Sequence, residues 1–359
     1  MGAGASFGVY VHVPFCRHRC DYCAFATWDD RGHLLDSYVE GVRQEIDEAA
    51  PDLPPVTSVF FGGGTPSLLA PAHVELVLAG LPLAGDAEVS LECNPETIDA
   101  ARLAGYRLAG ITRISLGAQS LVDAVLMSLD RSHDGATVVR AARAVASTGF
   151  ASWNLDLIYG TVGESLDDWR RTLAGAVELE APHVSAYGLT VEPGTPLAAD
   201  PSRAPDDDDQ ADKYVLAEEV LGGAGLASYE VSNWARPGHQ CRHNLLYWSQ
   251  GHYRGFGCAA HSHQDGRRWW NVRTPERYLA LVGAGESAVA AGEHLDEPGR
   301  RVEGLQLLLR TERGVPASDL DAEGLAGLVE PRDDRLVLTV AGRLLANEVA
   351  LRITDESRS

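Results

Sequence analysis

The sequence predicts an α/β fold, an open and partial barrel of six strand–helix units followed by a smaller C-terminal α+β domain. Short β-branched or aromatic runs alternate six times with longer Ala- and Leu-rich stretches of helical periodicity, the pattern of parallel strands joined by crossover helices. Six units are too few to close an eight-stranded barrel. From residue 228 onward the composition shifts toward aromatic residues and histidine, so we assign 1–227 to the barrel core and 228–359 to the C-terminal domain.

The elements follow in order along the chain. The expected strands are Val9–Val13, Ser58–Phe61, Val89–Glu92, Arg113–Leu116, Asn154–Ile158 and Val184–Leu189. The expected helices between them are Leu35–Ala49, Ala72–Leu81, Ile98–Ala109, Ala136–Ser147 and Leu166–Leu179. Near the C-terminus, Leu336–Thr339 and Gly342–Ala350 look like a strand leading into a helix, as in a small winged-helix-like unit.

Polar or glycine-rich groups stand at or just past the ends of the expected strands. Three cysteines follow the first strand, and Gly62–Thr65 follows the second. Glu92 ends the third, the fourth runs into Gln119, the fifth carries Asp156 and the sixth carries Tyr187. The carboxyl ends of barrel strands converge on one face, where active sites form. Loops are polar in any case, but six such positions in succession predict a site on this face.

Composition and charge exclude several classes of protein. The net charge of −21 argues against a nucleic-acid surface, because phosphate binding needs clustered cations. No apolar run reaches the ~18 residues that span a membrane. The N-terminus lacks the basic and long apolar segments of a signal peptide, so a cytoplasmic protein is expected. Three of the six cysteines lie within one short segment, which indicates metal binding rather than a disulfide scaffold.

Cys16, Cys20 and Cys23 have the spacing C-x3-C-x2-C directly after the first strand. Thiolates suit iron–sulfur clusters, and three of them in one loop can hold a [4Fe–4S] cube whose fourth iron stays open. That iron can chelate a small molecule through an amine and a carboxylate. The alternative is a structural zinc site with His12 or His18 as the fourth ligand, although zinc sites more often combine two cysteine pairs.

This segment, YVHVPFCRHRCDYC, resembles the radical SAM superfamily, and within it the branch that contains the anaerobic coproporphyrinogen III dehydrogenase. The resemblance extends through FFGGGTPSLL, SLECNPE, RISLGAQS, LDRSH and NLDLIYG, about two thirds of the chain. It implies a partial (β/α)6 barrel and S-adenosylmethionine (SAM) on the open iron. In such proteins a reduced cluster passes an electron to the sulfonium of SAM, which releases methionine and a 5′-deoxyadenosyl radical.

The same resemblance implies which residues contact SAM. Glycines let the backbone approach a ligand, and carboxylates accept hydrogen bonds from ammonium or ribose hydroxyl groups. The matches to residues that bind SAM are Tyr10, Gly63 and Glu92. The matches to residues that bind a second SAM or line the same cavity are Tyr22, Gly64, Thr65, Gln119, Arg131, Asp156 and Thr190.

Two departures separate this chain from the dehydrogenase. The dehydrogenase pattern continues C-x2-C-x-C, where this chain has Phe25. Only a short segment precedes Cys16, whereas the dehydrogenase carries a longer N-terminal extension that helps to close its active site. Both differences argue against decarboxylation of coproporphyrinogen.

The C-terminal part of the sequence indicates a function other than that of the dehydrogenase. SYEVSNWARPG, CRHNLLYW and GFGCAAHS resemble the HemW family of radical SAM haem chaperones, whose HNxxYW signature begins here at His243. An imidazole can bind haem iron while flat aromatic rings pack on the macrocycle. The alternative is a buried His243 satisfied by a hydrogen bond. Cys241 is a second candidate ligand or attachment point, and His261 and His263 are weaker ones.

The resemblance to the HemW family therefore favours a haem chaperone that passes haem to an acceptor protein, and it implies that this acceptor belongs to the respiratory chain. One alternative is a true coproporphyrinogen III dehydrogenase, which Phe25 disfavours. Another is a radical SAM enzyme that acts on a different tetrapyrrole. The cofactors expected are a [4Fe–4S] cluster, SAM and haem, and whether the chain catalyses a reaction is left open.

Overall fold

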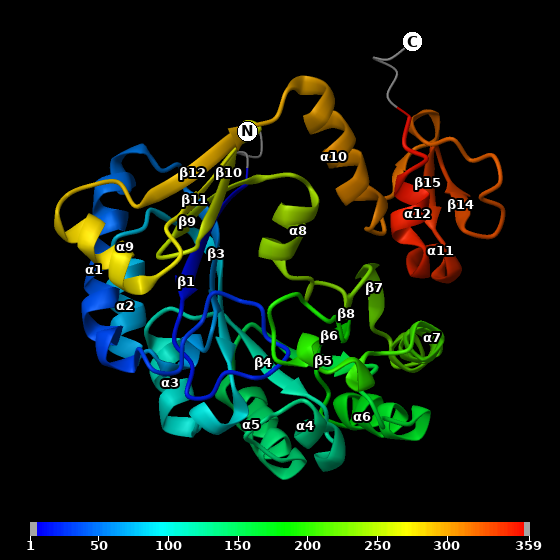
Figure 1. Cartoon of the computed structure of the whole chain (residues 1–359), viewed down its shortest axis with the longest axis horizontal. Helices are drawn as coiled ribbons and strands as arrows, with labels where there is room; N and C mark the ends of the chain where they lie inside the picture. Colours follow the sequence, from blue (N-terminus) through cyan, green and yellow to red (C-terminus); the bar gives the residue numbers. More distant parts are fainter. Residues whose placement is uncertain (1–5, 355–359) are drawn as a thin grey trace.

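Six parallel strands stand side by side in chain order at the centre of the structure, a computed structural model that describes residues 6–354 (Figure 1). Apart from the first half of β3, their side chains are mostly buried, as expected for parallel strands covered by crossover helices. All six expected strands are confirmed, and the third begins well before its apolar run. They are β1 (Phe7–Val13), β2 (Val56–Gly63), β3 (Leu83–Cys93), β4 (Arg113–Gln119), β5 (Ser152–Tyr159) and β6 (His183–Gly188).

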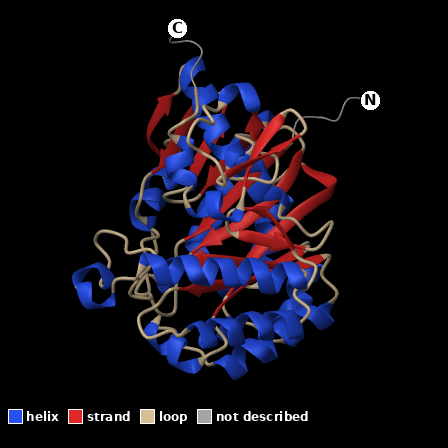
Figure 2. Cartoon of the chain, turned by 90° about the vertical axis from the view of Figure 1, so that its right-hand side faces the viewer, coloured by secondary structure: helices blue, strands red, loops and turns tan. Residues whose placement is uncertain are grey.

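Helices connect these strands and lie outside them, and Figure 2 shows the long helices running alongside the sheet. Several begin at an Asp or Ser whose side chain accepts a hydrogen bond from a backbone N–H of the first turn, among them Asp134, Ser165 and Asp206. The helices of this layer are α1 (Leu35–Ala49), α2 (Pro71–Ala79), α3 (Ala100–Leu108), α4 (Asp123–Ser128), α5 (Gly135–Thr148), α6 (Leu166–Glu178) and α7 (Asp207–Gly223).

The sheet stays open, which confirms the predicted partial barrel. Outside the six strands, β9 pairs in parallel with β1 and β8 pairs antiparallel with β6, so β1 and β6 do not meet. The sheet therefore continues through residue 228, where the sequence suggested a division of the chain. The added strands are β7 (Ala227–Glu230), β8 (Asn233–Ala235), β9 (His252–Phe256), β10 (His261–Gln264), β11 (Arg267–Asn271) and β12 (Val289–His294).

Three further helices accompany this second half of the sheet. The short α8 (Arg242–Trp248) packs on β1 and β2, and α9 (Pro275–Gly283) packs on α1. The third, α10 (Glu297–Leu309), leads from the sheet to the C-terminal unit (Figure 1). None of the helices within 6–354 is long and apolar enough to cross a membrane.

The C-terminal unit has its own small apolar core, which includes Leu309 and Val349. The expected strand near Leu336 is confirmed. The single helix expected over Gly342–Ala350 is wrong, because Leu345 leaves helical geometry at φ −113° and ψ 29° and divides it in two. The elements of the unit are β13 (Val315–Pro316), β14 (Val329–Arg332), β15 (Arg335–Leu338), α11 (Val340–Leu344) and α12 (Ala346–Ala350). The expected absence of a signal peptide rests partly on residues 1–5, which lie outside the described part.

Candidate functional site

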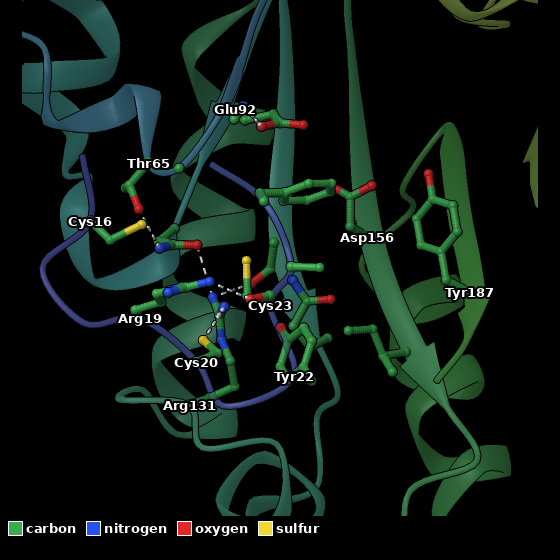
Figure 3. A pocket seen from close by; sticks show the side chains of 18 of the residues that line it. Cys16, Arg19, Cys20, Tyr22, Cys23, Thr65, Glu92, Arg131, Asp156 and Tyr187 are labelled. Atoms are coloured by element: carbon green, nitrogen blue, oxygen red, sulfur yellow. Dashed lines mark hydrogen bonds between the residues drawn. The ribbon is translucent and has the colours of Figure 1, made fainter. Parts of the chain in front are cut away.

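The three clustered cysteines lie on the loop that follows β1, which we call the cysteine loop, and all three line one cavity of about 440 Å³ (Figure 3). The loop is closed at its base, because the N–H of Cys16 donates to the carbonyl of Trp28 at 2.9 Å and the N–H of Trp28 donates to that of Pro14 at 2.8 Å. Within it, the N–H of Cys23 donates to the carbonyl of Cys20 at 3.1 Å. All three thiols are free and partly exposed to the cavity.

Arg131 reaches the cysteine loop from the segment after α4. Its Nη1 donates to the sulfur of Cys20 at 3.4 Å, and its Nη2 donates to Asn94 Oδ1 at 2.8 Å and to the carbonyl of Gly117 at 3.3 Å. Burial raises the pKa of the Cys20 thiol, and the neighbouring guanidinium opposes that increase. Burial likewise raises the pKa of Cys16. A fixed cation beside these thiols therefore favours the anionic state that a metal cluster requires.

Two glycines at the end of β2 let this strand approach the cysteine loop. Gly63 has φ +115°, a conformation that side chains rarely adopt. A Cβ on Gly64 would lie 2.6 Å from the carbonyl oxygen of Phe15 and 3.0 Å from the sulfur of Cys16. The N–H of Gly64 also donates to the carbonyl of Val13 at 2.8 Å. The backbone contact between β2 and the cysteine loop therefore requires glycine at both positions.

Two carboxylates face the same cavity from β3 and β5 (Figure 3). Glu92 Oε2 accepts from the N–H of Gly63 at 3.1 Å, and Asp156 accepts from Ser115 Oγ and from Asn154 Nδ2, both at 2.7 Å. Burial, with the nearby charge of Asp156, raises the pKa of Glu92 to about 8, and burial also raises the pKa of Asp156. A cationic ligand in the cavity would stabilise both carboxylates in their charged form.

The geometry weighs against the zinc alternative. Within residues 6–354 no group of three or more His, Cys, Asp or Glu side chains is close enough to hold a single ion. Both ring nitrogens of His12 already have partners, Tyr10 Oη at 3.0 Å and the carbonyl of Ala26 at 2.9 Å. His18 is paired with Asp130 at 2.8 Å. Because a [4Fe–4S] cube holds its thiolates further apart than one ion does, three thiols around a cavity fit the cube better.

The remaining residues implied by the resemblance fall mostly in one place. Tyr22, Gln119 and Thr190 line the cavity of the cysteine loop. Tyr10 lies outside it but lines an adjoining cavity of about 260 Å³, which shares Gly63, Glu92 and Asp156 with the first. Gln119 has φ +63°, at a register shift between β4 and β5. Sequence reasoning missed Asn94, which anchors Arg131, although it stands inside the quoted segment SLECNPE.

His243 is not brought to any of these cavities. Its side chain is buried in α8, where Nδ1 lies 3.0 Å from Ser58 Oγ and Nε2 lies 2.8 Å from Tyr247 Oη. The ring also stacks on Phe60 with 5.5 Å between centroids. Direct binding of iron by His243 would break one of these hydrogen bonds. Cys241 is buried as well, with its sulfur 3.6 Å from Glu88 Oε1.

Comparisons with known proteins agree with this geometry. The sequence pattern of the Radical SAM superfamily matches residues 10–174. The heme chaperone HemW of Mycobacterium tuberculosis strain H37Rv is 44% identical, over 96% of this chain and 94% of its own. The heme chaperone HemW of Escherichia coli K12 is 40% identical, over 76% of this chain and 75% of its own.

Among solved structures, coproporphyrinogen III oxidase (HemN) from Escherichia coli, described as a radical SAM enzyme, superimposes with a TM-score of 0.84. The match covers 98% of this chain and 91% of that one, at 23% sequence identity. At this level of identity the likeness shows the fold, and it supports the partial barrel that the strand order describes.

Proposed function

This chain belongs to the HemW family, and from that membership we propose that it is a haem chaperone, which binds haem and transfers it to an acceptor protein. The observation that carries the proposal is the likeness to a heme chaperone along nearly the whole chain, including the segment around His243. We place the protein in the cytoplasm and its acceptor in the respiratory chain, as the resemblance implies.

The chaperone would carry a [4Fe–4S] cluster on Cys16, Cys20 and Cys23, with SAM on the open iron. Three free thiols around one cavity and the cation of Arg131 support the cluster. Such a cluster supplies one-electron reduction of SAM. The backbone of Gly63 leaves room for the ligand.

The carboxylates of Glu92 and Asp156 and the ring of Tyr10 complete the proposed SAM site. Burial and the nearby charge of Asp156 raise the pKa of Glu92, and the sulfonium and ammonium charges of SAM would oppose that increase. Gln119, Thr190 and the phenol of Tyr22 line the same cavity, where they would contact the rest of the ligand.

For His243 we propose a positioning role. Its Nε2 holds the hydroxyl of Tyr247, whose ring in turn packs edge-on against Tyr253 at 4.6 Å between centroids. His243, the histidine of the HNxxYW signature, would therefore fix the orientation of the Tyr247 ring against Tyr253.

Anaerobic reconstitution with iron and sulfide tests the cluster. The expected result is a reduced [4Fe–4S] signal in EPR that changes when SAM is added, and its loss in Cys20→Ala. Cys258→Ala is the matched control, because Cys258 is a buried free cysteine that does not line the cavity of the cysteine loop. A zinc content of one with no EPR signal would contradict the cluster.

Haem titration of the same preparation tests the chaperone function. The expected result is saturable binding at one haem per chain and transfer to an apo-acceptor, with no protoporphyrinogen formed from coproporphyrinogen III. Formation of protoporphyrinogen at enzymatic rates would instead assign the dehydrogenase activity to the chain.

A further inference from the structure

A larger cavity of about 790 Å³ opens on the other side of the cysteine loop, and we call it the β10 cavity. Its walls come from the cysteine loop at Phe25, from α8 at Tyr247, from β9 at Tyr253, from β10 at His261 and His263, and from α10. Its volume falls within the ~300–1,000 Å³ range of small-molecule sites. The segments that form it come from residues 10–26 and 247–307, which lie far apart in the sequence.

We propose that haem binds in the β10 cavity and that His261 is the protein ligand of its iron. This inference rests on the proposed haem-binding function and adds to it the place and the ligand. In this proposal the iron ligand is not His243 of the HNxxYW signature, because that side chain is buried with both ring nitrogens in hydrogen bonds.

His261 is suited to bind iron. Its ring is exposed at the cavity, and among the described residues neither of its ring nitrogens has a hydrogen-bond partner. It stacks on Trp270 of the neighbouring strand, with 5.5 Å between centroids and 26° between planes, so the ring is supported on one side. Burial and the charge of Arg268 lower the pKa of His261, which keeps the imidazole neutral, the form that binds metals.

A second observation points independently to a ligand in this cavity. His263 is buried, and its Nδ1 donates to the carbonyl of Gly251 at 2.9 Å. A carbonyl can only accept, so Nδ1 carries a proton, and in the neutral imidazole Nε2 then presents a lone pair. This buried Nε2 has no hydrogen-bond partner in residues 6–354. A buried acceptor without a partner is costly, and a polar group of a bound ligand, such as water on the iron, would satisfy it.

The walls of the β10 cavity also offer contacts for the flat macrocycle and for the propionate groups of haem. Phe25 is 67% exposed, an unusual state for a large aromatic side chain, and a flat macrocycle in the cavity would cover it. The guanidinium of Arg268 is already paired with Glu303 at 2.7 Å and Glu293 at 2.9 Å. Arg273 lines the cavity without an ion pair among the described residues, so it is available to a propionate.

The test is haemin titration of the reconstituted full-length protein, followed by the Soret band and by EPR or resonance Raman spectra of the iron. We expect His261→Ala to lose the histidine-ligated spectrum and to bind haem roughly 10- to 100-fold more weakly, since even partners of metal ligands contribute on that scale. In His261→Gly, added imidazole is expected to restore the spectrum. His294→Ala is the matched control, because His294 is exposed on β12 and does not line the cavity.

The outcomes distinguish this inference from the proposed function. If the wild-type protein binds no haem, the proposed function fails. If wild type binds haem while His261→Ala keeps both affinity and spectrum, the β10 assignment fails and the function stands. Loss of the spectrum in His243→Ala or His263→Ala with His261→Ala unchanged would likewise overturn His261. A circular dichroism spectrum and melting temperature equal to those of wild type verify that each variant is folded.

Discussion

Replacing Glu92 with Gln should stabilise the cluster-free protein at alkaline pH. The carboxylate lies at the end of β3, where burial and the charge of Asp156 raise its pKa from 4.5 to about 8. In the unfolded chain Glu92 loses its proton near pH 4.5, whereas in the folded chain it keeps the proton until about pH 8. The folded state is therefore penalised as the pH rises through this window, and the penalty is absent below it.

The size of this stability penalty follows from the raised pKa of Glu92. Because one pKa unit corresponds to about 1.4 kcal/mol, a pKa raised from 4.5 to about 8 costs the folded state up to about 5 kcal/mol above pH 8. Part of the Glu92 side chain borders the cavity, where water can solvate it, so we expect roughly half of this ceiling. Gln keeps the shape and can still accept from the N–H of Gly63, but it cannot ionise.

Urea denaturation of the cluster-free wild type and of Glu92→Gln, at about pH 5 and about pH 8.5, measures the effect. The variant is expected to gain about 2–3 kcal/mol relative to wild type between the two conditions. Glu40→Gln, an exposed substitution on α1, is the control and should show no such gain. A difference between wild type and Glu92→Gln that stays constant with pH would refute the reasoning.

Three further substitutions test the packing of the cysteine loop and of the buried interior. Gly64→Ala places a methyl group against the backbone of the cysteine loop and the sulfur of Cys16, so iron bound per chain after reconstitution should fall sharply while the melting temperature falls only modestly. Lys213→Met leaves the buried carboxylate of Glu164 without its cation and should cost about 3–5 kcal/mol in urea denaturation, which a second Glu164→Gln change should largely restore. Tyr38→Phe removes a hydroxyl that joins the backbones of β1 and the segment after β9, and should cost about 1–3 kcal/mol by the same measurement.

The sequence predicts those parts of the fold that depend on patterns within one short segment. The helix over Leu35–Ala49 matches α1, because its apolar positions recur with the helical period and need no knowledge of distant residues. The cysteine loop is equally local, since the spacing of Cys16, Cys20 and Cys23 is set within one short segment. The glycine run at the end of β2 is visible too, because glycine weakens the interior of a strand and often marks a close approach of backbone.

What the sequence leaves out depends on contacts between distant segments. The pairing of β9 with β1 joins residues 252–256 to residues 7–11, and no short sequence pattern predicts this pairing. The same contact puts β10 beside the cysteine loop and so creates the β10 cavity. The HNxxYW signature predicts His243 as a haem ligand. Only the folded chain shows that both ring nitrogens of His243 are hydrogen-bonded, to Ser58 and to Tyr247.

Phe25 connects the two ligand sites. It lines the cavity of the cysteine loop, the adjoining cavity at Tyr10 and the β10 cavity. A ligand that orders this exposed ring from one side changes the surface met by a ligand on the other side, so SAM and haem would be coupled through it. Linkage requires the coupling to be reciprocal, so the factor by which SAM changes haem affinity must equal the factor by which haem changes SAM affinity. A cysteine at this position, as in the dehydrogenase pattern, would offer no such aromatic wall.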